Sequence, residues 1–144
     1  MKKLILAAVL CVLTAGTSLA AVSLDGGFFT ATAPDEEWTV TELEGGARAI
    51  TSPDHDVVIT VLVIENANVR DTASVLSAAH GAKSLVVMDE LGTAYEYIGS
   101  SIGKPLYCQV FDAGRDSVGC ISVIGNWKSP EASSVFNSIT LNEE

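Results

Sequence analysis

The sequence predicts a single α+β domain, in which a mostly antiparallel β-sheet is sandwiched by helices. Residues 57–64 read Val-Val-Ile-Thr-Val-Leu-Val-Ile, and β-branched residues on both faces are typical of a central strand covered on both sides. Other strand-like segments are joined by short, turn-rich connections, which indicates antiparallel neighbours. Amphipathic segments at 72–83 and 130–139 supply one helix for each face of the sheet.

The N-terminus has the three parts of a secretory signal peptide: a lysine pair, the apolar run 4–13 and small residues that end at Ala20–Ala21. This run is about half as long as a membrane-spanning helix needs. Cys11 follows a leucine inside the run, whereas a lipid-modified cysteine requires a small residue before it. We therefore expect residues 1–20 to be cleaved, leaving residues 21–144 as one domain in the periplasm or outside the cell.

The charge of the chain narrows the choice of partners. The sequence has 8 Lys+Arg and 18 Asp+Glu, and the signal peptide contains two of the lysines and none of the acids. Residues 21–144 therefore carry six basic and eighteen acidic side chains, a formal charge of −12. A field of that sign repels nucleic acid and anionic lipid, so we expect proteins, cations or neutral ligands as partners. Because the apolar run is cleaved, we do not expect an integral membrane protein.

Short strands are predicted before the central strand. Residues 26–33 form a strand-like segment that ends at a proline. Residues 38–41 and 47–51 flank Gly45-Gly46, a pair suited to a hairpin turn. Residues 52–56 read Ser-Pro-Asp-His-Asp, in which proline and aspartate favour a turn.

A helix is predicted over 72–83, with Asp71 as its candidate N-cap. Its apolar face is formed by Val75, Ala79, Ala82 and Val86. Residues 84–89 could continue this helix or form a separate strand, and propensity favours neither. Residues 94–98 are strand-like, and a turn-rich connection follows them.

Two cysteines remain after cleavage, and an exported protein permits a disulfide between them. Residues 106–111 and 117–124 flank a turn segment, 112–116, and predict a hairpin. If the first and last residues of 112–116 pair around a three-residue loop, Cys108 lies opposite Cys120. We therefore predict a structural disulfide between Cys108 and Cys120. A loop longer or shorter by one residue would move the two cysteines out of register.

The last element is a helix that follows the hairpin. Ser129 is a candidate N-cap, and Pro130 suits the first helical position. The buried stripe of this helix is formed by Ala132, Val135, Phe136 and Ile139. In total we expect about seven strands and two helices.

Taken in order, these elements resemble the PsbP-like fold of extrinsic photosystem II subunits and of small bacterial periplasmic proteins of the DcrB type. The residues that carry the resemblance are Phe28–Pro34, Trp38, the turn at 52–54, Gly103-Lys104-Pro105 and Ser138-Ile139. The resemblance implies an antiparallel sheet sandwiched by helices, usually without enzymatic activity, and roles in binding or assembling other proteins. It supplies no catalytic residues.

Candidate site residues are few. Asp54, His55 and Asp56 combine two carboxylates with an imidazole and could hold a divalent cation, although a solvated turn is the commoner use of such a segment. His80 has no carboxylate at helical spacing to support acid–base chemistry. Trp127, in a loop beside a glycine, is the candidate exposed aromatic for binding. We predict no catalytic residue and no cofactor.

These observations favour an exported, non-enzymatic protein that binds or supports another component of the cell envelope, most simply a protein. One alternative is a periplasmic module that binds a small ligand or a divalent metal at the turn 53–56. A further alternative is a secreted inhibitor of a cell-wall hydrolase, because compact disulfide-bonded domains suit that role.

Overall fold

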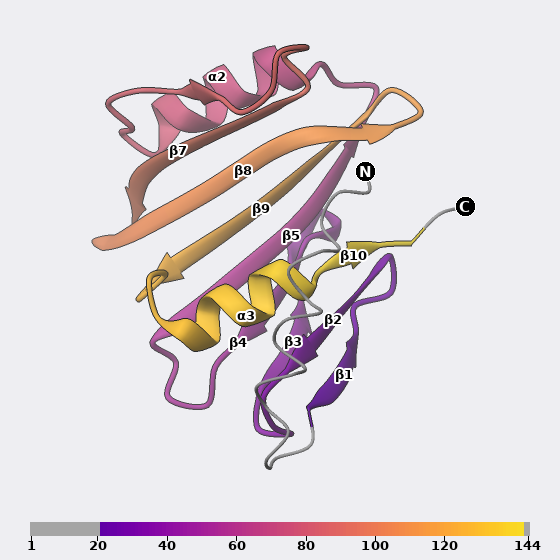
Figure 1. Cartoon of the computed structure of the whole chain (residues 1–144), viewed down its shortest axis with the longest axis vertical. Helices are drawn as coiled ribbons and strands as arrows, with labels where there is room; N and C mark the ends of the chain where they lie inside the picture. The colour runs from indigo at the N-terminus through magenta and orange to yellow at the C-terminus, as the bar shows by residue number, and fades with distance from the viewer. Residues whose placement is uncertain (1–20, 143–144) are drawn as a thin grey trace.

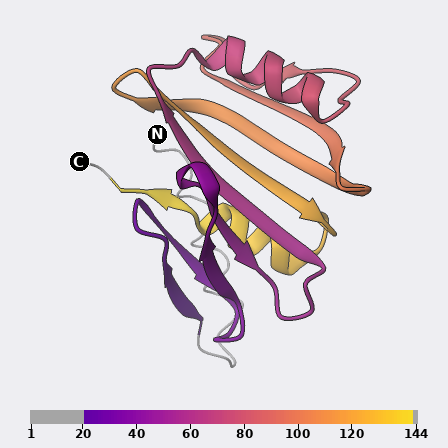
Figure 2. The ribbon, with the colours of Figure 1, turned by 180° about the vertical axis from the view of Figure 1, so that it is seen from behind.

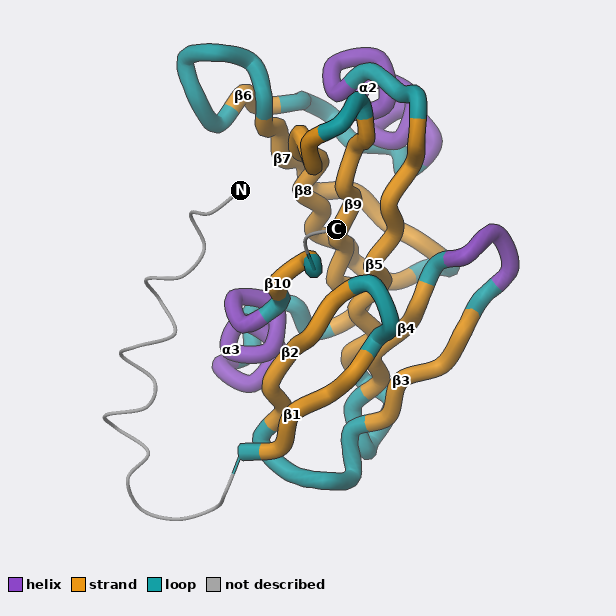
Figure 3. Tube along the Cα trace, turned by 90° about the vertical axis from the view of Figure 1, so that its right-hand side faces the viewer, coloured by secondary structure: helices purple, strands orange, loops and turns teal. Residues whose placement is uncertain are grey.

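The computed structural model describes residues 21–142, so the predicted signal peptide lies outside the described residues. Within these limits the chain forms two antiparallel β-sheets and two α-helices, which confirms the α+β class (Figure 1). Helix α2 (Val69–Ala79) lies on one side of the larger sheet, and helix α3 (Pro130–Ser138) lies on the other (Figure 3).

The larger sheet has the strand order β3-β4-β5-β9-β8-β7-β6, and every neighbouring pair is antiparallel. Its strands are β3 (Thr39–Glu42), β4 (Arg48–Thr51), β5 (Val57–Glu65), β6 (Val86–Val87), β7 (Ala94–Ser101), β8 (Lys104–Gly114) and β9 (Ser117–Gly125). A 3-10 turn, η2 (Glu44–Gly46), connects β3 to β4. The smaller sheet has the order β1-β2-β10, with β1 (Val22–Asp25), β2 (Phe29–Ala33) and β10 (Thr140–Leu141).

Two hydrophobic clusters lie on opposite faces of the large sheet. On one face, α3 and the small sheet pack over β5 and β9, and the side chains of Phe29, Ile59, Val61 and Val135 are fully buried. On the other face, α2 packs over β7 and β8. That second cluster contains Ala73, Tyr97, Leu106, Cys108, Val110, Val118 and Cys120. The layer formed by α3 and the small sheet lies over different strands from the layer formed by α2. Each layer therefore leaves part of its own face of the large sheet uncovered (Figures 2 and 3).

The central strand β5 shows this offset directly. Its residues Val57, Ile59 and Val61 are buried under α3 and the small sheet. The alternate residues Val58, Thr60 and Leu62 face the other way and are only half-buried. The two-sided cover predicted for this strand is therefore only partial on this face, where Leu62 and Ile64 pack against the second cluster while α2 lies over β7 and β8.

Helix α2 starts and ends earlier than predicted. Its N-cap is Asn68, whose side-chain oxygen accepts a hydrogen bond of 3.0 Å from the amide of Asp71, so Asp71 lies inside the first turn. The helix ends before Gly81, which has a positive φ of 67° that terminates helices readily. Val75, predicted on the apolar face, is 67% exposed. The open choice for residues 84–89 is answered in favour of a strand, β6.

The start of α3 is as predicted. The Ser129 side chain accepts a hydrogen bond of 3.1 Å from the amide of Ala132, and Pro130 occupies the first turn. Ala132, Val135 and Ile139 are buried against the core, which confirms the predicted stripe, and Phe136 packs at its edge.

The register predicted for the β8–β9 hairpin is wrong by two residues. Cys108 pairs with Ser122, and Cys120 pairs with Val110. The turn is formed by Arg115 and Asp116, which both have positive φ, at 54° and 59°. A β-bulge between Asp112 and Gly114 adds one residue to β8, so the loop of two residues and the bulge replace the three-residue loop of the prediction.

Cys108 and Cys120 are therefore diagonal neighbours on one face, and both are free and buried. Diagonal neighbours lie about 7–8 Å apart, beyond the usual Cα separation of a disulfide of about 4.4–6.8 Å. The directly opposite placement of the two cysteines, on which the predicted disulfide depended, is therefore absent. Burial raises the pKa of Cys108 to about 11 and that of Cys120 to about 12, which keeps both thiols protonated and unreactive at neutral pH.

We expect a protein of residues 21–144 to resist alkylation at pH 8 while it is folded and to take up two alkyl groups once unfolded without reductant. Intact mass after iodoacetamide treatment measures both states. If the unfolded protein takes up label only after reduction, Cys108 and Cys120 are joined and the register argument fails.

Gly125 is required where β9 ends. Its φ is 103°, and a Cβ atom at this position would lie 1.9 Å from the main-chain oxygen of Asp56. We expect Gly125→Ala to lower the free energy of unfolding by more than about 2 kcal/mol, measured in urea. Gly103→Ala is the matched control, because Gly103 also has a positive φ, 75°, but has nothing within 4 Å of its added Cβ. The control should cost only about 1 kcal/mol, and equal losses would contradict the crowding at Gly125.

Candidate binding site at the loop end of the sheet

Three connections meet at one end of the large sheet, on the left in Figure 1. They are the β4–β5 loop (52–56), the β7–β8 turn (102–103) and the β9–α3 loop (126–129). Antiparallel pairing brings them together, because β5 and β8 begin at this end and β7 and β9 finish there. An open hollow of about 670 Å³ lies here, which we call the loop-end hollow. It is lined by Asp56, Ile98, Lys104, Pro105, Gly125, Asn126, Trp127 and Lys128.

Trp127 is half-buried at the wall of the hollow, so it is a partly exposed aromatic. Its ring stacks on Tyr107 with centroids 5.2 Å apart and planes at 25°. Tyr107 in turn meets the ring of Phe136 edge-on, with centroids 5.8 Å apart. The Nζ of Lys128 lies 5.3 Å from the centroid of the Trp127 ring, a cation–π distance. These contacts hold the indole in one orientation.

A polar network continues from Tyr107 across the open face of β7 and β8. The Tyr107 hydroxyl donates a hydrogen bond of 2.6 Å to Glu96 Oε1 and accepts one of 2.8 Å from Gln109 Nε2. Burial raises the pKa of Tyr107, and so does the bond to Glu96, so the hydroxyl stays a donor. Sequence reasoning missed Glu96 and Gln109, because only the β7–β8 register places Glu96 beside Gln109.

The predicted metal residues lie in the β4–β5 loop, where they stabilise the turn itself. Asp54 Oδ1 accepts hydrogen bonds from the Ser52 hydroxyl at 2.8 Å and from the Asp56 amide at 3.0 Å, and these bonds lower the pKa of Asp54. His55 has a positive φ of 64°, and its Nδ1 lies 3.2 Å from the Pro53 carbonyl oxygen. Within residues 21–142, no three His, Cys, Asp or Glu side chains are grouped to hold a metal ion.

His80 lies on the opposite face of the sheet, at the end of α2. Its side chain finds a hydrogen-bond partner on a strand and not on its own helix. Its Nδ1 lies 2.7 Å from the Tyr97 hydroxyl, and its main-chain oxygen accepts a hydrogen bond of 2.9 Å from the amide of Ser100. Burial raises the pKa of Tyr97 and lowers that of His80, so the phenol donates and the neutral imidazole accepts. The contact joins α2 to β7, which is a structural role.

The lowered pKa of His80 makes stability depend on pH. Since the unfolded chain takes up the proton more readily, this contribution is complete above about pH 6.5 and is lost as the pH falls through the folded pKa. We expect the free energy of unfolding of the natural protein to fall between pH 7 and pH 5 relative to that of His80→Asn, whose amide oxygen replaces Nδ1 as acceptor. Denaturant titrations at several pH values measure this difference, and parallel curves would contradict it.

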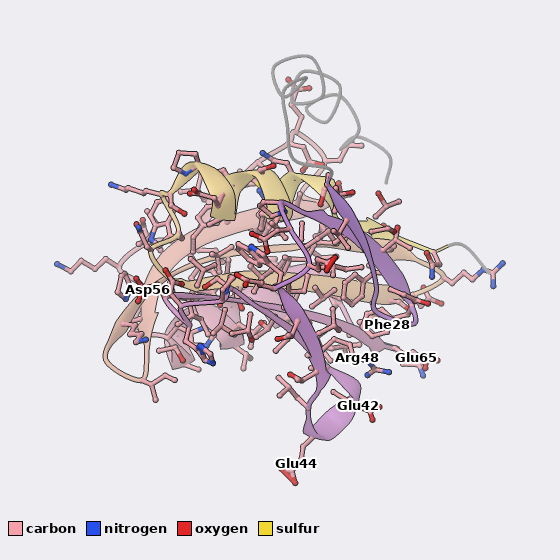
Figure 4. The ribbon with its side chains drawn as sticks, turned by 90° about the horizontal axis from the view of Figure 1, so that it is seen from below. Phe28, Glu42, Glu44, Arg48, Asp56 and Glu65 are labelled. Carbon is pink, nitrogen blue, oxygen red and sulfur yellow. The ribbon has the colours of Figure 1, made fainter. Side chains whose placement is uncertain are left out.

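Arg48 lies at the other end of the sheet, where Figure 4 shows it between Phe28 and Glu42. Its Nη2 lies 3.3 Å from Glu42 Oε2, and its guanidinium carbon lies 5.5 Å from the centroid of the Phe28 ring. Its Nη1 donates a 3.0 Å hydrogen bond to the carbonyl oxygen of Gly46. These contacts tie the β1–β2 turn to β4, so Arg48 is a structural residue.

No family model matches the chain, and no curated protein matches it. A solved structure that is similar comes from Bacteroides thetaiotaomicron VPI-5482, determined at 1.50 Å resolution. The similarity has a TM-score of 0.50 at 18% sequence identity, over 89% of this chain. This chain spans 50% of the length of that protein, and the likeness is one of fold alone. No described helix is long and apolar enough to cross a membrane.

Proposed function

We propose that residues 21–144 form an exported, non-enzymatic protein of the PsbP-like fold that binds another component of the cell envelope through the loop-end hollow. The observation that carries this proposal is the lining of the hollow, which combines exposed apolar side chains with two ammonium groups. The signal-peptide pattern of residues 1–20 supports export. The arrangement of antiparallel strands and helices suits the PsbP-like resemblance.

The contacts around the hollow favour binding over proton transfer. The Tyr107 hydroxyl is occupied by Glu96 and Gln109, and the Asp54 carboxylate is occupied by its own turn. Trp127 is held by the stacking contact with Tyr107, so little side-chain freedom is lost when a partner covers it. Ile98 is 56% exposed beside these residues and offers apolar area to the same partner.

The open shape of the hollow favours a macromolecule over a small ligand. Its volume of about 670 Å³ falls within the usual range of ligand sites, about 300–1,000 Å³, which keeps a small-ligand module as the second candidate. Ligand sites usually enclose most of their ligand, however, whereas two exposed lysines and an exposed isoleucine stand at the rim of this hollow.

The test is capture of a partner by the immobilised mature protein from envelope extract. We expect the double variant Ile98→Asp, Lys104→Glu to retain the partner at least about tenfold less well, since it places acid on the apolar and basic rim. Val75→Asp is the matched control, because Val75 is 67% exposed on α2, on the opposite face. Melting temperatures of all three proteins verify folding.

Equal retention by the double variant and the natural protein would overturn the proposed site. Saturable binding of a small molecule with no captured protein would favour the second candidate. Inhibition of a cell-wall hydrolase by the natural protein would identify the captured component as that enzyme.

A further inference from the structure

Strand β6 forms one edge of the large sheet and presents apolar side chains to solvent. It pairs with β7 on one side, and within residues 21–142 no strand pairs with its other side (Figure 3). Its two residues, Val86 and Val87, are 49% and 51% exposed, and Met88, which follows them, is 45% exposed. An exposed apolar edge strand is a template for pairing with another chain, because its outer N–H and C=O groups are available.

The opposite edge of the same sheet carries the protection that edge strands usually have. β3 reads Thr-Val-Thr-Glu, so polar and charged side chains border that edge. Charged side chains and proline prevent edge strands from pairing with other chains. β6 is short, which limits any contact, but it contains neither a charge nor a proline. The apolar character of β6 is therefore a property of this edge and not a requirement of the sheet.

The bonds between β6 and β7 show which backbone groups of β6 point outward. The Met88 amide donates a hydrogen bond of 2.8 Å to the carbonyl oxygen of Ala94. Val86 lies opposite Glu96, two positions away along the same ladder. Because bonded positions alternate in an antiparallel pair, Val86 and Met88 direct their backbone groups toward β7, and Val87 directs its own to the open side. A strand added at this edge must therefore bond to Val87.

The charges at the two ends of β6 favour a second copy of this chain in antiparallel orientation. Lys83 precedes the strand, and Asp89 and Glu90 follow it. A two-fold axis at the second residue of β6 places residues 83–85 of one copy opposite residues 89–91 of the other. Each lysine then meets the acidic end of the other copy, and no carboxylate lies directly opposite another. A parallel arrangement would place the acidic residues side by side, which is unfavourable.

The remaining negative charge near β6 weakens this contact without opposing its register. Asp89 accepts hydrogen bonds from the amide and the hydroxyl of Thr93, and Glu96 accepts one from Tyr107 on the strand pair behind β6. Each copy of residues 21–144 also carries a formal charge of −12. At physiological ionic strength charges act over about 8 Å, so salt screens the long-range repulsion between two copies more than it screens the contacts at β6.

We propose that two copies of this chain pair through β6 in antiparallel orientation, about a two-fold axis at Val87, and so join their large sheets into one continuous sheet. In this register Val87 exchanges hydrogen bonds with Val87 of the second copy, and Val86 lies opposite Met88 of the second copy. The exposed apolar side chains of the edge thereby cover one another. The contact is short, so the dimer is weak and reversible. This proposal does not depend on the protein partner proposed above.

Sedimentation velocity of a protein of residues 21–144, between about 10 μM and about 1 mM, tests the proposal in the range of weak interfaces. We expect dimer to form as the concentration rises, and more of it at about 0.15 M salt than at about 0.01 M salt. The decisive variant is Val87→Pro, because proline removes the outward N–H and leaves the bonds of Val86 and Met88 to β7 in place.

We expect Val87→Pro to weaken dimerisation at least about tenfold, since each copy loses a hydrogen bond and the ring obstructs the approach of the other strand. Val87→Thr is the matched control, because threonine keeps the N–H and the β-branched shape, and it should dimerise nearly as the natural protein does. Melting temperatures of both variants verify folding.

The charge argument has its own pair of variants. Lys83→Glu places a carboxylate opposite the acidic end of the second copy, and we expect it to weaken dimerisation. Lys104→Glu is the matched control, since it changes the net charge equally but lies at the start of β8. We expect the loss from Lys83→Glu to exceed that from Lys104→Glu by about threefold or more.

A natural protein that stays monomeric over the whole concentration range would overturn the proposal, and so would a folded Val87→Pro that dimerises as the natural protein does. If Val87→Pro does not fold, the lysine variants decide, and equal dimerisation by Lys83→Glu and Lys104→Glu overturns the proposal. Loss of envelope capture through Ile98 and Lys104 alone, with dimerisation unchanged, would affect the proposed function and not this inference.

Discussion

The antiparallel pairing of β5, β9 and β8 is the constraint on which the rest of the structure depends. β9 pairs along its whole length with β5 on one side and with β8 on the other. The register of these strands decides which residues share a face and where each strand ends. It therefore places both hydrophobic clusters and also brings three connections to one end of the sheet.

The offset of the two helices follows from this strand pairing and leaves the loop-end hollow open. α3 returns over β5 and β9 after the chain leaves β9, whereas α2 lies over β7 and β8 on the opposite face. On its own face of the sheet, α3 reaches β8 only at its edge, where Phe136 meets the Tyr107 ring, so Tyr107 stays half-buried and Ile98 exposed. A second helix there would have closed the hollow. The open end is thus a consequence of how the sheet is covered.

Hydrophobic pattern predicted the class, the central strand and the second helix, because those features depend on local periodicity and on caps such as Ser129. The hydrophobic pattern did not predict the register of the β8–β9 hairpin, because one residue more or less in the turn changes which residues pair. The turn lies at Arg115-Asp116 instead of within 113–115, and together with the bulge near Gly114 this places Ser122 and not Cys120 opposite Cys108, which no local signal in the sequence distinguishes. Part of the candidate site is evident from the sequence, which indicates Trp127 and Asp56 separately. Strand register brings these two residues close to Ile98 and Lys104, and this proximity could not be predicted from the sequence.

We propose that the loop end is the part of the molecule that contacts its partners. Amide hydrogen exchange of residues 21–144, with and without envelope membranes and their proteins, tests this most directly. We expect slower exchange in residues 101–104 and 125–129, and unchanged exchange in the β6–β7 loop, residues 88–93. Protection confined to the β6–β7 loop, to α2 or to the small sheet would contradict it.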